Sequence, residues 1–412
     1  MALLPLDEAI DIVTQTALAL RESHPPDTRV TTLWEASGFV IATDVRADRP
    51  MPPFDKSMMD GFAVRAADLV GASTELVVVD EIAAGEVPSR EVGPGEAIAI
   101  MTGAPIPLGA DAVVVVERTQ RAGERVIVQG TIGVGANIAR LGSQVAEGEI
   151  VVERGRIIES LTAGVLASFG AHEVPVYRRP RMTVIATGDE LVSVEETPGP
   201  AQIRDSNRKT LMALGEAEWC RVVDGGIAKD DRHELARNIR DGLDGDVLVL
   251  SGGVSAGSYD HVRECLEAEG VEILFHQIAI KPGKPVLFGR TARTLVFGLP
   301  GNPVSSYVTA MLLLVPAVRI LGRRPDARSW YLDLPLVERG LDATQGRTTF
   351  HPADLVRLDG DALGVRPRAW DGSADHVAYA RASVLIRRDP QASAAMPGEH
   401  VRVLMPRSLV EW

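Results

Sequence analysis

The sequence has too few cysteines and too little histidine patterning for a disulfide framework or a structural zinc site. Among its 412 residues only Cys220 and Cys265 are cysteines, and they form no CxxC pair. The eight histidines show neither the HxH nor the HExxH spacing of common metal motifs. A reducing cytoplasm suits this composition, and both thiols are expected to be buried in the predicted strand and helix that contain them.

Positive charge is in deficit too. The chain has 43 lysine and arginine residues against 56 acidic ones, a formal net charge of −13. Non-specific nucleic-acid binding needs a basic footprint, and anionic membranes attract basic segments. Neither nucleic acid nor a membrane is therefore expected as a partner. An anionic ligand would have to be held by local positive groups or by a bound metal ion.

Long apolar runs are also missing. The most apolar stretch, residues 305–321, contains polar residues, Pro316 and Arg319, and it predicts a buried helix rather than a membrane span. The N-terminus has no basic region or cleavage site, and Asp7 and Glu8 interrupt its apolar residues. We expect a cytoplasmic protein of two to four domains.

The spacing of apolar residues, and with it the predicted secondary structure, changes along the chain. Residues 5–24 and 159–170 have helical periodicity, whereas residues 45–145 read as short strands separated by glycine and proline. Residues 180–322 alternate apolar strands with helices, which indicates a doubly wound α/β sheet. After residue 330 the strands are short again, so a second β-rich domain is predicted.

Unusual loops follow four of the predicted α/β strands. They read ATGDE, GGIAKDD, SGGVSAGSYD and KPGKP. Ligands of open α/β sheets bind beyond the carboxyl ends of the strands, so we expect these loops to share one edge and to form the site. The Walker loop, the GxGxxG fingerprint and the GxSxG elbow are all missing.

Two interpretations fit SGGVSAGSYD equally well. Its glycines, its hydroxyls and the helix that follows suit an anion site, and Asp260 could also reach a ligand. Alternatively, the stretch is a strand–turn–helix connector with Asp260 as the helix N-cap.

Lys281 and Lys284, each followed by proline, could extend over apolar surface into solvent. With SGG on the same edge we favour contact with a phosphate or another oxyanion.

Several carboxylates accompany these cations. Asp189 and Glu190 end a strand, and Asp231 with Glu234 fits a capping box, which leaves Asp230 or Asp231 to face the cleft. Carboxylates beside a phosphate site would repel the anion unless a hard cation joined them, so Mg²⁺ is the expected cofactor.

Three further loops have both a structural and a functional interpretation. PPFDKSMMDGFAV (52–64) is a stiff turn that exposes Asp55 or Asp60, and its apolar residues suggest that it packs against something. MTGAPIPLGADAVVVVE (101–117) places Thr102 before a strand, either as a plain connection or as part of a site. FGLPGNPVSS (297–306) is explained by helix capping through Asn302 or Ser305.

Taken together, PPFDKSMMDGFAV, MTGAPIPLGADAVV, ATGDELV, IRDSN, SGGVSAGSYD, IKPGKP and GLPGNPVSS resemble the molybdopterin molybdenumtransferase family, which includes the MoeA proteins and the gephyrin E-domain. The resemblance implies a multidomain α/β plus β fold. It contains a linking domain (1–45 with 146–179), a β-rich domain (46–145), an α/β molybdopterin-binding domain (180–327) and a C-terminal β-barrel (328–412).

The implied function is insertion of molybdate into adenylylated molybdopterin, with release of AMP and help from Mg²⁺. The implied partners are a second copy of the chain and a molybdopterin adenylyltransferase. By motif, the catalytic residues would be Asp60, Thr102, Glu190, Asp230 and Asp260, of which Glu190, Asp230 and Asp260 would bind the metal. The substrate-binding residues would be Ser251, Gly252, Gly253, Ser255, Lys281, Lys284, Pro300, Arg347 and Ser373. Asp60 and Thr102 would reach the cleft from the partner subunit.

Four residues depart from the family pattern. Ser143 and Gln144 replace an acidic pair, Pro352 stands where an arginine is common, and Lys56 replaces a small polar residue. The alternatives are thus a molybdopterin-binding or scaffold protein that inserts metal poorly, a tungstate-preferring inserter, and an adenylylating relative. The β regions at both ends of the chain count against the adenylylating relative.

Overall fold

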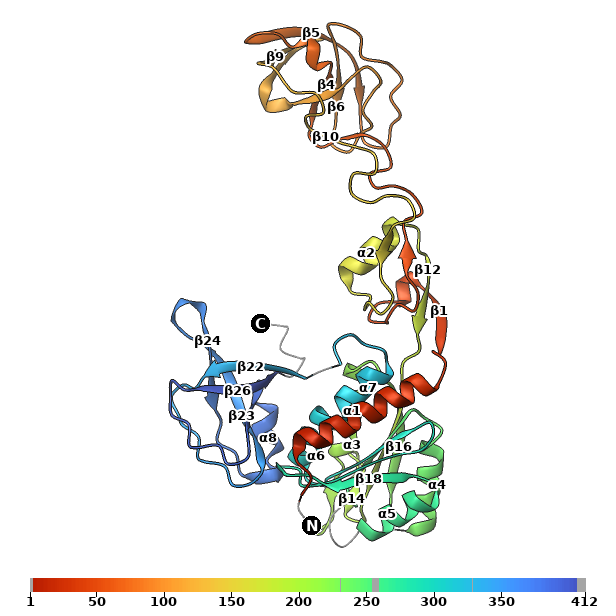
Figure 1. Ribbon diagram of the computed structural model, residues 1–412, viewed down its shortest axis with the longest axis vertical. Coiled ribbons are helices and arrows are strands. Elements are labelled where there is room, and N and C mark those ends of the chain that lie inside the picture. Colours follow the sequence, from red (N-terminus) through yellow and green to blue (C-terminus); the bar gives the residue numbers. More distant parts are fainter. Residues whose placement is uncertain (1–2, 230, 254–258, 328, 406–412) are drawn as a thin grey trace. The chain divides into compact units, whose positions relative to one another are not determined.

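The computed structural model describes residues 3–229, 231–253, 259–327 and 329–405, and it consists of two compact units (Figure 1). The larger unit comprises Met1–Ala42, Gly155–Glu159 and Val174–Trp412, and the smaller one Thr43–Arg154 and Ser160–Glu173. Each unit is described by itself.

A mixed sheet organises the larger unit. Its strands, in spatial order, are β16 (Arg221–Ala228), β13 (Arg181–Thr187), β17 (Val247–Ser251), β21 (Leu295–Leu299), β20 (Pro285–Arg290) and β18 (Glu272–Gln277). The first four are parallel, β20 is antiparallel to β21, and β18 is antiparallel to β20. The predicted α/β sheet is confirmed, and β18 runs in the same direction as the four parallel strands.

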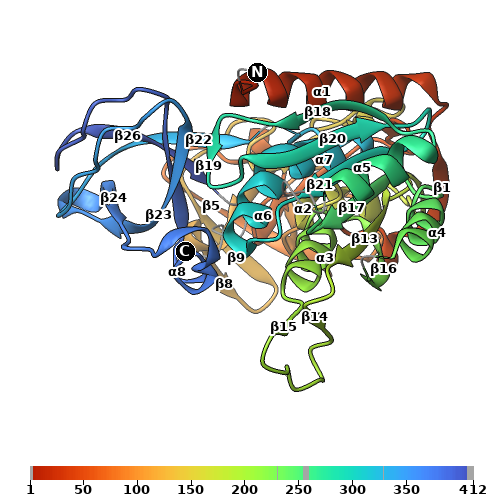
Figure 2. The ribbon, with the colours of Figure 1, turned by 90° about the horizontal axis from the view of Figure 1, so that it is seen from below.

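Helices cover both faces of this sheet (Figure 2). One face carries α1 (Leu6–Ser23), α3 (Asn207–Ala217), α6 (Pro303–Thr309), the π-helical stretch η4 (Ala310–Leu314) and α7 (Val315–Leu321). The other carries α4 (Arg232–Gly242) and α5 (Tyr259–Ala268). The helices predicted from periodicity are therefore present, with α1 spanning all but the ends of residues 5–24.

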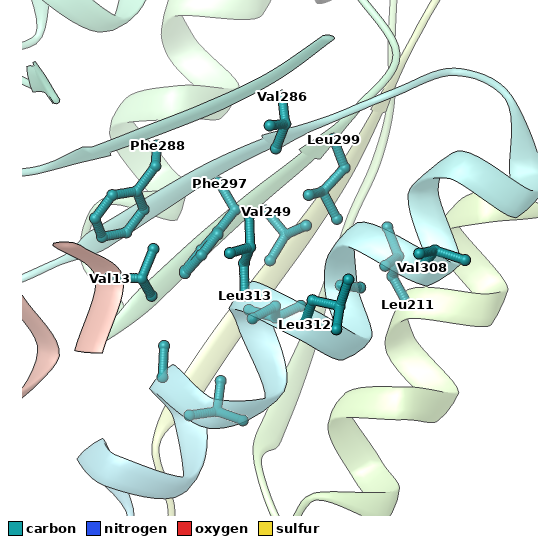
Figure 3. Packing of buried hydrophobic residues seen from close by; sticks show 14 of the residues in the cluster. Val13, Leu211, Val249, Val286, Phe288, Phe297, Leu299, Val308, Leu312 and Leu313 are labelled. Carbon is teal, nitrogen blue, oxygen red and sulfur yellow. The ribbon is translucent and has the colours of Figure 1, made fainter. Parts of the chain in front are cut away.

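The main core lies between the sheet and the α1, α6 and α7 side. Figure 3 shows Phe288 and Phe297 of neighbouring strands close to Val13 of α1; the two ring centroids lie 5.0 Å apart. Each fully buried aromatic side chain contributes about 1.5–3 kcal/mol of transfer free energy. The helical stretch Pro303–Leu321 is long and apolar enough to cross a bilayer, but 89% of it is buried inside the protein. This confirms the buried helix that was predicted there.

A second sheet follows in the larger unit. Its order is β19 (Ile280–Lys281), β23 (Thr348–Arg357), β25 (Val384–Arg388), β26 (His400–Met405) and β22 (Trp330–Pro335), with β24 (Leu363–Pro367) also paired to β23. The short helix α8 (His376–Ala380) precedes β25. Phe350, Leu385 and Leu404 belong to the same core as the mixed sheet, so this C-terminal sheet packs directly on the α/β layers.

The smaller unit is built on a separate sheet with an apolar cluster on each face. Its order is β7 (Ala112–Val115), β4 (Gly61–Val64), β6 (Glu96–Ile100), β5 (Ser73–Ile82), β9 (Arg125–Gln129) and β8 (Thr119–Ala122). Short ladders join β10 (Ile138–Ala139) to β3 (Lys56–Ser57) and β11 (Ile150–Val152) to β2 (Val45–Arg46), and α2 spans Ser160–Ser168. The short strands predicted for residues 45–145 are present.

Two remaining ladders lie outside these sheets. They pair β1 (Thr28–Thr32) with β12 (Glu173–Tyr177), and β14 (Leu191–Val192) with β15 (Ile203–Arg204).

Both cysteines are free and buried, as expected, and burial raises the pKa of the Cys220 thiol to about 12.

A buried ion pair connects α7 to the end of α3. Arg319 donates to both carboxylate oxygens of Glu218 at 2.6 and 2.7 Å, and the two side chains are 8% and 4% exposed. Removing one member of such a pair leaves a buried charge without its partner.

We expect Glu218→Ala to lower the free energy of unfolding by about 3–5 kcal/mol, because Arg319 would keep its charge in a buried site. Urea unfolding followed by circular dichroism measures this loss. Glu267→Ala is the control, since it removes the exposed Arg263–Glu267 pair on α5; such a pair contributes about 0.3–0.5 kcal/mol. Equal losses in the two variants would contradict the assignment.

Candidate active site

The loops singled out from the sequence lie at one edge of the mixed sheet. Because β18 is parallel in direction to β13, β16 and β17, its carboxyl end lies at the same edge as theirs. The loop after β21, which begins at Pro300, joins them there. The expected convergence of four loops is confirmed, and a fifth loop is added.

The SGG segment packs tightly against the neighbouring strand β13. A Cβ on Gly252 would lie 2.4 Å from Thr187 O, and one on Gly253 would lie 2.6 Å from Thr187 Oγ1, so both positions require glycine. Both glycines also have positive φ, +91° and +67°. Ser251 is buried, and its hydroxyl has no hydrogen-bond partner among the described residues.

Ser255 and Asp230 lie outside the described residues. Helix α5 begins at Tyr259, so Asp260 is its second residue and the N-cap interpretation was wrong. The carboxylate of Asp260 is not part of what the structure describes.

Asn302 joins the loop after β21 to the C-terminal sheet region. Its side-chain amide donates to Ser373 Oγ at 2.9 Å, whereas it makes no capping hydrogen bond to α6. Asn302 thus occupies the N-cap position of α6, as expected, but its side chain contacts Ser373 instead of the helix. In the same loop, Gly301 accepts from Asn207 Nδ2 at 2.8 Å, and Leu299 accepts from the Gly252 N–H at 3.1 Å. Ser373, Pro300 and the SGG segment are thus held together.

The loop with the two lysines is anchored at both ends. Lys281 lies in β19, which pairs with β23, and the Lys284 carbonyl accepts from the Ile278 N–H at 3.1 Å. Pro282 and Gly283 between them are buried, but both lysine side chains are exposed. Neither ammonium group forms an ion pair within the described part of the chain. Two unpaired cations on an anchored loop suit an anionic ligand.

Arg347 lies next to this loop. It directly precedes Thr348, the first residue of β23, and Thr348 pairs with Ile280 of β19. Arg347 is half-buried, and its backbone carbonyl accepts from the Thr349 hydroxyl at 3.3 Å. The C-terminal sheet therefore places a third cation beside the two lysines.

The carboxylates have separate roles. Asp231 accepts from the backbone N–H groups of His233 and Glu234 at 3.1 and 2.9 Å, so it caps α4 as the capping box predicted. Glu190 is exposed, and its carboxylate lies over Gly188, where an added Cβ would be 2.5 Å from Oε2. Within the described ranges no three His, Cys, Asp or Glu side chains come close enough to bind a metal ion.

Asp60 and Thr102 meet in the smaller unit, at the ends of paired strands. Asp60 precedes β4 and Thr102 follows β6, and the two strands are antiparallel neighbours. Asp60 Oδ1 accepts from the Thr102 N–H at 2.6 Å and from its hydroxyl at 2.8 Å. The backbone N–H of Thr102, followed by its hydroxyl, holds the pKa of the Asp60 carboxyl below its usual value. An exposed carboxylate stays ionised there.

The neighbouring Asp55 has a different role. It accepts from Arg140 Nη1 at 2.6 Å and from the Leu141 N–H at 2.7 Å, which fastens its loop to residues 140–141. The Leu141 N–H, and to a lesser extent Arg140, lowers the pKa of Asp55. Of the two aspartates left open by the sequence, Asp60 is therefore the one available to a ligand.

A cavity of about 250 Å³ opens beside Asp60. Its apolar lining includes Phe62 and Met101, and the ion pair between Arg121 and Glu81, 3.1 Å long, lies at the same cavity. Arg121 and Glu81 lie on different strands without a motif, so the sequence gives no signal for them. Other apolar side chains of the 52–64 loop are exposed: Phe54, Met58 and Met59.

Two of the residues that depart from the family pattern, Gln144 and Pro352, have defined backbone contacts. The N–H of Gln144 donates to Met51 O at 2.9 Å, and Gln144 lines a cavity of about 620 Å³ beside α2. Pro352 lies within β23, and its carbonyl accepts from the Arg368 N–H at 2.9 Å. On that edge, pairing with β19 ends at Thr349 and pairing with β24 begins at Ala353. The Pro352 carbonyl continues the pairing on the β24 side, whereas proline has no N–H to donate there in return.

These features describe a multidomain α/β protein that presents glycine-rich loops and unpaired cations to an anionic ligand. Two family models match the chain: the MoeA N-terminal region (domain I and II) over residues 4–170, and a probable molybdopterin binding domain over residues 183–320. Lys281 and Lys284 lie in residues 183–320, which match the model described as a probable molybdopterin binding domain.

Named relatives match almost the whole chain. Molybdopterin molybdenumtransferase from Staphylococcus aureus (strain MSSA476) is 31% identical, covering 98% of this chain and 96% of the relative. Molybdopterin molybdenumtransferase 2 from Mycobacterium tuberculosis (strain ATCC 25618 / H37Rv) is 36% identical, covering 83% and 88%. The solved molybdopterin biosynthesis moeA protein from Pyrococcus horikoshii OT3 has a TM-score of 0.81 at 26% identity, covering 98% and 100%. The chain belongs to the molybdopterin molybdenumtransferase (MoeA) family.

The Asp60–Thr102 contact gives a pH-dependent prediction. Thr102→Val removes the hydroxyl donor, so the pKa of Asp60 should rise toward its ordinary 3.8, whereas Thr102→Ser should keep it low. Because the folded pKa is depressed, the contact stabilises the fold above the ordinary pKa and is lost as the pH falls through the folded pKa. Carboxyl NMR titration of both variants measures the shift. Identical titration in valine and serine variants would contradict a role for the hydroxyl.

Proposed function

We propose that this protein inserts molybdate into adenylylated molybdopterin and releases AMP, as an enzyme of molybdenum cofactor biosynthesis. The observation that carries the proposal is the shared edge of the mixed sheet, where SGG, Lys281, Lys284 and Ser373 come from separate segments. Membership of the family supports the same role. This edge supplies positive charge and close backbone approach, which a pyrophosphate-containing substrate needs.

Each group has a distinct task in this proposal. Lys281 and Lys284 would bind phosphate oxygens or molybdate, since both are exposed and unpaired among the described residues. Gly252 and Gly253 let the substrate approach the backbone. Arg347 and Ser373 would orient the oxyanion beside the dithiolene. Attack of water on the adenylyl phosphorus would cleave the phosphoanhydride bond and release AMP. Molybdate would lose one oxygen, which leaves as water with the two thiol protons, as molybdenum bonds to the two sulfurs.

Mg²⁺ suits the carboxylates Glu190, Asp230 and Asp260, of which the structure describes the side chain of Glu190. Magnesium is held by one or two carboxylates plus substrate phosphates, and it retains several waters. Glu190 is an exposed carboxylate at this edge, Asp260 is in the first turn of α5, and Asp230 lies outside the described residues. Bound there, the ion would polarise the phosphoanhydride. Glu190 would hold the ion, whose positive charge would reduce the repulsion between the carboxylates and the phosphates.

Asp60 and Thr102 would complete the site from the second subunit of a homodimer. Their tight hydrogen bonding keeps an ionised carboxylate on an exposed surface, and the neighbouring Phe54, Met58 and Met59 are exposed apolar residues that a partner or substrate would cover. An acidic, cysteine-poor chain suits the cytoplasm. A molybdopterin adenylyltransferase would supply the substrate.

We further propose the four-part division expected from the family resemblance: residues 1–45 with 146–179, 46–145, 180–327 and 328–412. The last of these would close as a β-barrel. The backbone bridge between Leu336 and Val365 supports that closure, because it brings the chain beyond β22 to β24 at the other side of the C-terminal sheet.

One alternative has an observation in its favour. Pro352 keeps its place in β23, opposite Leu385 of β25, so the strand accepts a proline where an arginine is common in the family. A molybdopterin-binding or scaffold protein with weak metal insertion would tolerate this replacement. Tungstate preference is a variant of the main proposal, since the two oxyanions have the same shape and charge.

The direct test is to incubate the pure protein with adenylylated molybdopterin, molybdate and Mg²⁺, and to follow AMP release and cofactor formation together. The proposal predicts that both products form, that both need Mg²⁺, and that ATP is not consumed. Substrate binding without either product would establish the scaffold alternative. ATP consumption would indicate an adenylylating enzyme.

In the same assay, Asp60→Ala should reduce turnover by roughly 10²-fold or more, as expected for a group that acts on the reaction. Its stability should change little, because the carboxylate is exposed. Asp55→Ala is the matched control: it breaks the contact with Arg140 and should reduce stability more than turnover. Wild-type turnover in Asp60→Ala would remove Asp60 from the site.

The proposed dimer has its own test. Leu161 on α2 is 86% exposed and lines the 620 Å³ apolar cavity of the smaller unit together with Val165. If a second subunit covers this surface, Leu161→Glu should shift the mass measured by light scattering from dimer to monomer. Val87→Glu, which alters an equally exposed valine elsewhere in that unit, should leave the mass unchanged. A monomeric wild type would contradict the dimer.

A further inference from the structure

Two arginine side chains of the larger unit line one small cavity, and each has a buried nitrogen without a hydrogen-bond partner. The cavity has a volume of about 20 Å³ and lies between residues 38–40, residues 177–180, the end of α3 and the end of α7. In its lining, Arg179 Nε and Arg324 Nη1 lack a partner among the described residues. The described residues that line the cavity include none of those proposed for the active site.

Aromatic rings hold Arg179 at this cavity. Its guanidinium carbon lies 4.4 Å from the centre of the Phe39 ring and 4.3 Å from that of Trp219. The Trp219 ring rests on Gly38, where an added Cβ would come within 1.8 Å of it. The position of the guanidinium is thus fixed by the packing of the protein itself, which favours binding of a small ligand.

The charge of Arg179 is not balanced by a carboxylate. The preceding Arg178 forms ion pairs with Asp27 and Asp246. Arg179 forms no ion pair within the described ranges. Burial, and then the charge of Arg29, lower the pKa of Arg179. Because a partly buried cation without an opposite charge is unfavourable, an anion beside Arg179 would be stabilising.

Arg324 supplies the second donor. Its side chain is 3% exposed, and its Nε and Nη2 donate to the two oxygens of Asp326 at 3.0 and 3.1 Å. This fork leaves Nη1 over. Glu218 also lines the cavity, but both of its oxygens accept from Arg319, so its charge is already matched.

The two guanidinium groups converge near one buried residue, Cys220. Burial is the main cause that raises the pKa of its thiol, and the carboxylates of Glu218 and Asp246 add to the rise. The charges of Arg324 and Arg179 act against it. Both cations therefore lie close to the same thiol, although 144 positions separate them in the sequence.

The size of the cavity restricts the ligand. A volume of about 10–15 Å³ holds one water-sized sphere, so about 20 Å³ admits a monatomic ion and excludes phosphate, sulfate and carboxylates. A water molecule would bring no charge, and its two protons would need acceptors of their own. Chloride is only slightly larger than water, accepts several N–H groups, and carries the missing negative charge.

We infer that Arg179 and Arg324 form a binding site for one chloride ion, with the Trp219 ring in its wall. The ion would balance Arg179 and connect residues 38–40 and 177–180 to the ends of α3 and α7. The stability of the larger unit would then depend on chloride. The inference does not rest on the proposed function, because it uses none of the active-site residues.

Thermal unfolding of the full chain in sodium chloride and in sodium gluconate, at equal ionic strength, tests the site. Gluconate is too large for the cavity, and equal ionic strength cancels general screening. An ion that binds only the folded state stabilises it as its concentration exceeds the dissociation constant. A tenfold excess of chloride over that constant should raise the melting temperature by roughly 2 °C relative to gluconate.

Arg179→Met should abolish the difference between the two salts, because methionine keeps apolar contact with the rings but has no charge and no N–H group. Arg323→Met is the matched control. Arg323 precedes Arg324, lies 5.1 Å from the Tyr177 ring and is not among the lining residues, so its loss should leave the chloride effect intact. A purely structural effect of either change would lower the melting temperature equally in both salts. A full chloride effect in Arg179→Met would overturn the inference.

Bromide, which scatters X-rays anomalously, locates the ion directly. Wild-type crystals soaked in sodium bromide should show an anomalous peak between Arg179 and Arg324, and Arg179→Met crystals should show none there. A wild-type cavity without bromide would overturn the inference and leave a water molecule as the occupant. The same conclusion would follow from equal melting temperatures of the wild type in chloride and gluconate.

Discussion

Two backbone residue pairs, Ile280 with Thr348 and Lys281 with Thr349, connect the lysine loop to the C-terminal sheet. This ladder orients the loop, because Lys281 is a strand residue on one side while Lys284 closes back onto Ile278 on the other. The same ladder brings Arg347 to the carboxyl edge of the mixed sheet. The cations of an acidic protein are thereby concentrated where the glycine-rich loops end.

The opposite direction of β20 makes this arrangement possible. β18 ends at the ligand edge and leads into the lysine loop; β20 then runs away from that edge, and β21 returns to it. The loop after β21 reaches the same edge and holds Ser373 through Asn302. The α/β layers and the C-terminal sheet share one apolar core, so the loops of both are supported by the same packing.

Several features could be predicted from sequence because their causes are local. Periodicity located the helices, an Asp and a Glu three residues apart marked the α4 cap, and polar loops after apolar strands marked the edge of the sheet. Strand direction is not encoded locally, so the place of β20 could not be derived. Asn302 before Pro303 looks like an ordinary cap, and its contact with Ser373 depends on residues 71 positions away.

The central claim is that one edge of the mixed sheet, together with the C-terminal sheet, binds the oxyanion substrate. Anomalous diffraction at the molybdenum absorption edge, from crystals grown with molybdate, tests it most directly. The account predicts a molybdenum peak bounded by the Lys281–Lys284 loop and the start of β23. A peak only at a distant surface, or none at saturating molybdate, would contradict it.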